Sequence, residues 1–132
     1  MACSLTRMQS LRTILLVSAL AFGLVAFIHT GWLFPNWTDP TARLAEGLIA
    51  ADLVVLLAVT FLWPVAARPV ALVGLVLALL FTLLGATITL LVGGPRVVIE
   101  VGYHLVLIGL LVAGIVIAWR MPARSGADAS GA

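Results

Sequence analysis

Charged residues are scarce in this chain, and lysine is absent altogether. The 132 residues include seven basic and five acidic ones, so that 9% are charged while 64% are hydrophobic. A soluble domain has about 25% charged residues, and this chain has too few to cover a surface that faces water. The mean hydropathy is +1.27. The composition therefore predicts an integral membrane protein, and the length limits it to one domain.

Cysteine and the usual catalytic motifs are also nearly missing. The single cysteine, Cys3, excludes an internal disulfide, a Cys-x-x-Cys redox pair and a metal site with several cysteines. The sequence has no glycine-rich phosphate loop, no Gly-x-Ser-x-Gly and no His-Glu-x-x-His. Basic residues are too few to bind nucleic acid. We therefore expect no enzymatic activity, no cofactor and no nucleic-acid partner.

What the chain does have is four long apolar segments. Each is long enough to cross the ~30 Å hydrocarbon layer as a helix, which needs about 20 residues. A helix is expected because an isolated strand would leave its backbone amides unpaired in lipid. The links are short, so that consecutive helices should be antiparallel neighbours in an all-α four-helix bundle. We expect the spans over 13–34, 43–63, 69–92 and 97–119.

The segments that flank the four spans are short. Residues 1–12 are expected to be an N-terminal tail, and the polar residues 120–132 a disordered C-terminal tail. The first apolar run is too long for a signal peptide, so it is interpreted as a retained span. Between the first two spans, Asp39 is a candidate N-cap, with Pro40 at the first helical position.

Arginines indicate how the chain is oriented. Five lie on one side of the four-span arrangement and two, Arg43 and Arg96, on the other. The positive-inside rule then predicts a multi-pass protein of the inner (plasma) membrane with both termini in the cytoplasm. Tryptophan and arginine near span ends are typical of interfacial anchors. The expected anchors are Trp32, Trp37, Arg43, Trp63, Arg96 and Trp119.

Several ionisable residues lie inside the spans. His29 and His104 come from different spans but share nearly one depth, toward the outer side, whereas Asp52 lies near the middle of span two. Glu100 and His104 share a helix face, and Tyr103 can join them. Charged groups at this depth are costly, so they usually face the bundle interior or water. The candidate polar pocket consists of His29, Glu46, Asp52, Glu100, Tyr103 and His104.

Each of these residues also has a plain structural interpretation. Glu46 and Glu100 fall in early turns of helices that start at the outer side, where the helix dipole stabilises an anion. The histidines can be neutral and satisfied by neighbouring groups. Asp52 can be a polar clamp between helices, paired with His29 or His104. The sequence leaves the structural and the functional roles open.

Two stretches carry a resemblance to known proteins. The stretches "RLAEGLIAADLVVLLA" and "GPRVVIEVGYHLVLIGLLVAG", at 43–58 and 94–114, resemble a group of small bacterial four-span membrane proteins of unknown function. That group has a similar Glu early in span two, and a Gly-Pro-Arg before a Tyr-His in span four. A weaker likeness is to the DoxX-like four-helix membrane proteins. The resemblance covers about residues 12–119 and implies the fold without a reaction.

Three functional hypotheses follow. The first, which we favour, is a non-catalytic accessory or oligomer-forming protein of the bilayer, with itself or another membrane protein as partner. The second is a proton-linked transporter of a small solute or ion that uses Asp52, Glu46, Glu100 and His104. The third is a protein that binds haem b through His29 and His104, or a metal through the same histidines with Glu46.

Overall fold

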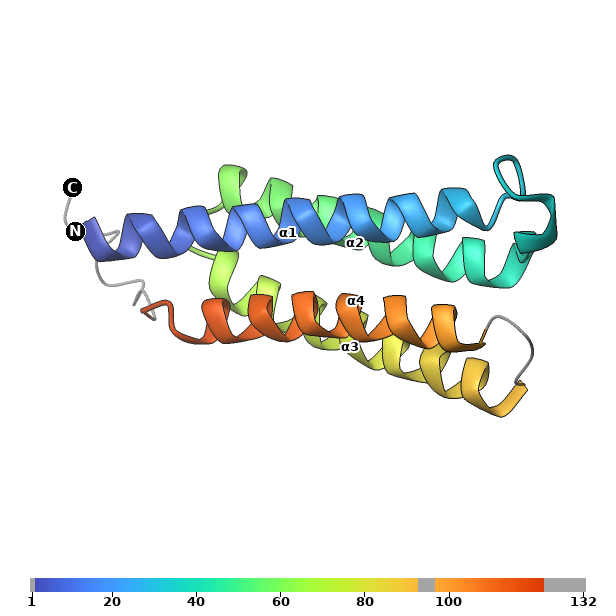
Figure 1. Ribbon diagram of the computed structural model, residues 1–132. Coiled ribbons are helices and arrows are strands. Elements are labelled where there is room, and N and C mark those ends of the chain that lie inside the picture. The colour runs from blue at the N-terminus through green and yellow to red at the C-terminus, as the bar shows by residue number, and fades with distance from the viewer. Residues whose placement is uncertain (1, 93–96, 123–132) are drawn as a thin grey trace.

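The protein consists of four long helices joined by short links. The computed structural model describes residues 2–92 and 97–122, and within these ranges it contains helices and no strand. Figure 1 shows the helices running side by side along most of the length of the molecule. In chain order they are α1 (Ala2–Ile28), a short 3-10 helix η1 (Pro35–Trp37), α2 (Pro40–Leu62), α3 (Ala67–Val92) and α4 (Val97–Trp119).

Each long helix can cross a membrane. The apolar stretches are 23 to 26 residues long, and they cover Leu5–Ile28 of α1 and the full lengths of α2, α3 and α4. At about 1.5 Å per residue, the shortest still spans roughly 35 Å. The protein is therefore a multi-pass membrane protein, and the predicted all-α four-helix membrane bundle is confirmed.

The four helices are arranged in a ring, and each helix packs against two neighbours. α1 packs against α2 and α4, and α3 packs against the same two neighbours. Figure 1 shows that neighbouring helices run in opposite directions. The two ends of the bundle differ in chemistry. We call the end with Arg7, Arg12, Arg68 and Arg120 the arginine end, and the end with His29 and His104 the histidine end.

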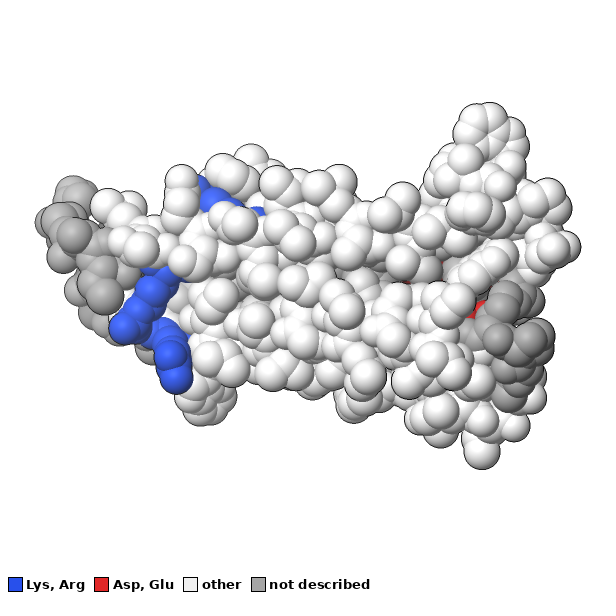
Figure 2. Space-filling view, viewed as in Figure 1, with Lys and Arg blue, Asp and Glu red and all other residues white. Residues whose placement is uncertain are grey.

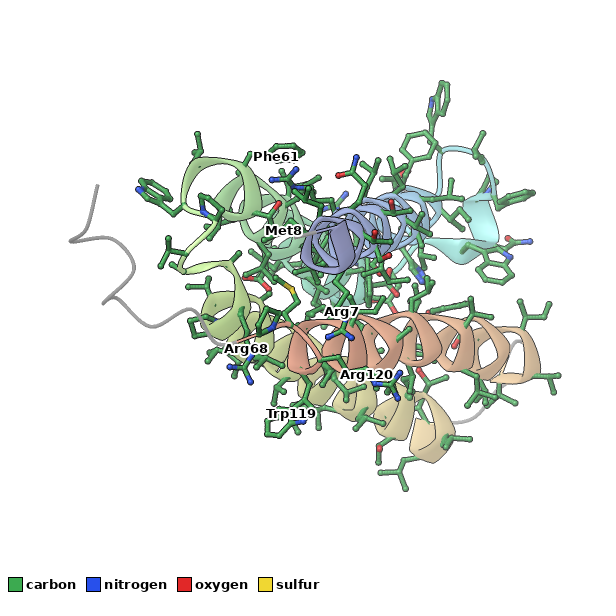
Figure 3. All side chains as sticks on the ribbon, turned by 90° about the vertical axis from the view of Figure 1, so that its left-hand side faces the viewer. Arg7, Met8, Phe61, Arg68, Trp119 and Arg120 are labelled. Carbon is green, nitrogen blue, oxygen red and sulfur yellow. The ribbon has the colours of Figure 1, made fainter. Side chains whose placement is uncertain are left out.

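The arginine end collects basic side chains from several helices. Figure 3 looks onto this end and shows Arg7 of α1, Arg68 of α3 and Arg120, which follows α4, around the ends of these helices. The Arg7 guanidinium donates a hydrogen bond to the backbone carbonyl of Arg120. On the face seen in Figure 2, arginine side chains lie only toward this end. Charge is therefore distributed unevenly along the bundle axis.

Small and branched apolar side chains fill the centre of the bundle. Leu15 of α1, Leu53 of α2 and Leu111 of α4 are completely buried. Gly74 of α3 allows a close approach to α2, because a Cβ at Gly74 would lie 2.6 Å from Cδ1 of Leu56. Most other large apolar side chains point outward, where lipid covers them.

The first helix ends earlier than the hydropathy indicates. We expected span one over 13–34, but α1 ends at Ile28, and the chain turns at Gly31, whose φ of 76° favours glycine. The hydroxyl of Thr30 bonds back to the carbonyl of Phe27 at 2.7 Å. The apolar residues that follow hide this break in a hydropathy profile. At its other end α1 begins at Ala2, so that most of the expected tail 1–12 is helical.

The start of α2 agrees with the prediction. Asp39 is the N-cap, and its carboxylate accepts hydrogen bonds from the backbone N–H groups of Thr41 and Ala42, at 3.0 and 2.9 Å. Pro40 occupies the first helical position. The helix therefore begins three residues before the expected span at 43. Of the expected tail 120–132, only residues 120–122 lie within the described part of the chain.

Candidate functional site

The histidine end contains a buried polar cluster built from three helices. His29 directly follows α1, Glu46 lies in the second turn of α2, and Tyr103 and His104 lie in the second turn of α4. His29, Glu46 and His104 are only 3%, 6% and 7% exposed. We call these four residues the histidine cluster. Segments far apart in the sequence thus place their polar side chains together inside an apolar bundle.

His29 is the centre of this cluster. Its Nε2 lies 3.3 Å from the Tyr103 hydroxyl and 3.7 Å from Oε2 of Glu46. Its Nδ1 lies 3.3 Å from the backbone carbonyl of Trp37 in η1. A carbonyl oxygen only accepts, so Nδ1 must carry the proton. In a neutral imidazole Nε2 then accepts, and the Tyr103 hydroxyl donates to it.

Glu46 is the member of the cluster that is least well satisfied. Its Oε2 is buried and has no hydrogen-bond partner in the described part of the chain. A buried carboxylate needs a nearby cation or several donors, and the nearest candidate cation is a protonated His29. Glu46 is therefore either neutral or paired with a His29 imidazolium.

His104 connects the cluster to the remaining helix, α3. Its Nδ1 donates to the backbone carbonyl of Glu100, one turn earlier, at 2.7 Å. Its ring stacks on Tyr103, with 4.5 Å between centroids and 24° between planes. Its Nε2 faces Gly85 of α3, where a Cβ would lie 3.5 Å away. The expected contact between Glu100 and His104 is present, but it runs through the backbone of Glu100.

Asp52 does not belong to the cluster. In the ranges 2–92 and 97–122, no hydrogen bond or ion pair joins its carboxyl to another residue. Its side chain is half-buried, and it lies on α2 between the exposed Leu48 and Val55. The pairing with His29 or His104 that the sequence allowed is not formed. Five of the six candidate residues thus gather at the histidine end, and the sixth lies apart.

The expected interfacial anchors are mostly exposed, and Trp37 is the exception among those that the structure describes. Trp32, Trp63 and Trp119 are 77%, 62% and 69% exposed, as an aromatic side chain in the membrane interface would be. Trp37 is different, because it is half-buried and its ring lies 6.4 Å from that of His29. Arg43 is exposed, and Arg96 lies outside the described residues.

Two groups that hold the ends of the bundle together have no clear signature in the sequence. The first is the backbone carbonyl of Trp37, whose position depends on η1 and has no signature in the side-chain pattern. The second is at the arginine end, where Arg12 donates to the hydroxyl and the carbonyl of the buried Thr60, at 3.2 and 2.6 Å. The Arg12 guanidinium also lies over the Phe61 ring, 3.9 Å from its centroid. A threonine near a span end resembles a lipid-facing residue in sequence.

The histidine cluster is poorly suited to a metal or a haem. Within the described residues, no three His, Cys, Asp or Glu side chains are placed to hold a metal ion. The Tyr103 side chain contacts both imidazoles, with ring centroids 6.3 Å from His29 and 4.5 Å from His104. A porphyrin between two axial histidines needs that space. The geometry instead favours hydrogen bonding and the sharing of a proton among His29, Tyr103 and Glu46.

Comparisons with protein-family models, with curated proteins and with solved structures find no match for this chain. What the cluster does is therefore inferred from its own geometry.

Proposed function

We propose that this protein is a non-catalytic accessory or oligomer-forming protein of the inner (plasma) membrane, and that its histidine cluster is a structural clamp. The observation that supports this role is the position of His29, which contacts Tyr103 of α4, Glu46 of α2 and the backbone of Trp37. These contacts join the two halves of the bundle at one end. A clamp of this kind holds a shape, and a partner can then recognise that shape.

Physical conditions in the bilayer favour such a clamp. Lipid is as apolar as a leucine side chain, so burial from water does not drive helices together inside it. Close packing and hydrogen bonds between helices take over that role, at about 0.6–1.7 kcal/mol for each bond. In the cluster, His29 shares a hydrogen bond with Tyr103 of α4 and lies 3.7 Å from the carboxyl of Glu46 of α2, and His104 contacts α3 at Gly85. It therefore acts on all four helices.

The proposed orientation has the arginine end in the cytoplasm. Arg7, Arg12, Arg68 and Arg120 lie at that end, and Arg43 lies at the other. Under the positive-inside rule, this distribution places both termini inside. Membership of the group of small bacterial four-span proteins stays a prediction that rests on the sequence alone.

A proton-linked transporter is the second candidate. Its support is the buried Oε2 of Glu46, which has no hydrogen-bond partner among the described residues and lies beside His29. Against it, Asp52 would have to be the floor of the path, and it lies about 9 Å further along α2 than Glu46 by helical rise. No described contact connects the two residues. The structural role therefore accounts for more of the geometry.

The replacement Tyr103→Phe tests the clamp. It removes one hydroxyl and keeps the ring that stacks on His104. We expect the thermal midpoint in mild detergent to fall by several degrees, because a hydrogen bond worth about 0.6–1.7 kcal/mol is lost. The matched control is Thr87→Val, which removes an exposed hydroxyl that bonds only within its own helix, to the carbonyl of Leu83.

The same proteins can be placed in vesicles with an imposed pH gradient. Under the clamp proposal, wild-type vesicles keep the gradient as long as empty vesicles do. A Tyr103→Phe variant that melts at or above wild type, together with rapid loss of the gradient in wild-type vesicles, would favour the transporter and contradict the clamp.

A further inference from the structure

A carboxyl group near the middle of a membrane-spanning helix has no hydrogen-bond or ion-pair partner among the residues that the structure describes. Asp52 is the thirteenth of the 23 residues of α2, so its Cα lies about 1.5 Å along the axis from the middle of that helix. No hydrogen bond or ion pair to the described residues reaches it. A carboxyl group at this depth is costly for a membrane protein unless a polar or charged group accompanies it.

The surroundings of Asp52 face outward. Leu48 and Val55, one turn to either side, are 63% and 59% exposed. Leu56, which shares a helix face with Asp52, packs onto Gly74 of α3. Asp52 therefore lies where the lipid-facing surface of α2 meets the contact between α2 and α3. A helix outside the bundle can reach its carboxyl from the lipid.

The chain itself cannot supply a cation at this depth. It has no lysine, and its seven arginines are at positions 7, 12, 43, 68, 96, 120 and 124, all near or beyond the ends of spans. A second copy of the chain would therefore bring another acid to this surface and no lysine or arginine. Charge complementarity indicates a different protein.

We propose that Asp52 marks a lateral docking site for a transmembrane helix of a partner protein that carries an arginine or lysine near the middle of the bilayer. That helix lies against α2 beside its contact with α3. Its cation pairs with the Asp52 carboxylate, and in the bilayer each charge compensates the cost of the other. The inference rests on the accessory role proposed above, and it specifies the chemistry of the partner.

Synthetic transmembrane peptides provide the probe. We would use a leucine-rich helix of about 21 residues with a single central lysine, and the same peptide with leucine in place of the lysine. The full-length protein carries a donor dye, the peptide carries an acceptor, and energy transfer is measured in phosphatidylcholine vesicles. We expect wild type to bind the lysine peptide at least ten times more tightly than the leucine peptide. With Asp52→Leu this preference is lost.

Controls separate this site from other carboxyls and from misfolding. Glu100→Gln removes a carboxyl near the start of α4 and keeps the preference. The exchange of lysine for leucine in the peptide is itself made on the unmodified protein, so the test does not depend on a variant that folds poorly. Asp52→Asn, which keeps the shape of the side chain, weakens binding of the lysine peptide as Asp52→Leu does.

Two outcomes would overturn the proposal. One is equal binding of the two peptides by wild type. The other is energy transfer between copies of the protein, without peptide, that disappears in Asp52→Leu, because the site would then belong to a second copy. The clamp is tested at Tyr103 by thermal stability, so failure at Asp52 leaves that result unaffected, and failure at Tyr103 leaves the peptide result interpretable.

Discussion

At the scale of single residues, His29 connects most of the polar groups at the histidine end. Its two ring nitrogens have different partners, a backbone carbonyl at Nδ1 and the Tyr103 hydroxyl at Nε2. The carbonyl fixes which nitrogen carries the proton when the ring is neutral. The Tyr103 hydroxyl then has a defined direction in which to donate. One imidazole thus orients groups that come from three separate segments.

A double-mutant cycle between His29 and Tyr103 measures this contact directly. We expect His29→Ala and Tyr103→Phe to be coupled by about 0.5–2 kcal/mol, because the two side chains touch and share a hydrogen bond. The free energy of unfolding would be measured by titration with a denaturing detergent in mixed micelles. The control cycle pairs His29→Ala with Thr13→Val, whose hydroxyl bonds within α1 to the carbonyl of Gln9. Equal coupling energies in the two cycles would contradict the hydrogen bond.

At the scale of helices, α2 and α3 make a close contact through a single glycine. Gly74 faces Leu56, and a Cβ at this position would lie 2.6 and 2.7 Å from the two methyl carbons of that side chain. These atoms are the end of a flexible side chain, so a methyl group forces Leu56 to move and a larger group forces the helices apart. The contact therefore depends on the absence of a side chain at position 74.

We expect Gly74→Val to lower the unfolding free energy by about 1–3 kcal/mol, as overpacking of a filled core does. The second replacement Leu56→Ala should recover part of that loss by removing the atoms that clash. Gly109→Ala is the matched control, because a Cβ at Gly109 meets nothing within 4 Å. The measurement is the thermal midpoint of each variant in the same detergent. A Gly74→Val protein as stable as the Gly109→Ala control would show that the two helices do not approach closely there.

The sequence predicts these helices well but their rotation poorly. Apolar length and the break around Asp39 were sufficient to place four spans, because both follow from local composition. The expected end of the first span lies six residues beyond the end of α1, because the apolar residues after the turn at Gly31 keep the hydropathy high. The distance of each residue from the midpoint of its span predicted that His29 and His104 lie at nearly the same depth in the membrane. Whether Asp52 points to them depends on how α2 is turned against its neighbours, and packing decides that.

At the scale of the whole molecule, the proposed orientation rests on the chemical difference between the two ends. Arginines from three helices gather at one end, and the other end has a buried acid and two buried histidines. A cytoplasmic leaflet that is rich in anionic lipid attracts the arginine end. This distribution supports the orientation that we propose, with the loop between α1 and α2 outside.

Cysteine accessibility tests this orientation. In a Cys3→Ser background, Leu33→Cys reports the histidine end and Val65→Cys the arginine end, at positions that are 49% and 58% exposed. A membrane-impermeant maleimide added to intact cells should label Leu33→Cys. It should label Val65→Cys only after the membrane is opened. The reversed pattern would place both termini outside.

The contacts between α1 and α2 also bear on how the chain is made. Arg12 with Thr60 at one end, and His29 with Glu46 at the other, lie entirely within the first 60 residues. A ribosome that has delivered only these two helices to the membrane has already supplied every group that joins them. The Tyr103 hydroxyl arrives later, with the last helix. Biogenesis can thus proceed as one hairpin that holds itself together, followed by a second that docks onto a surface already formed.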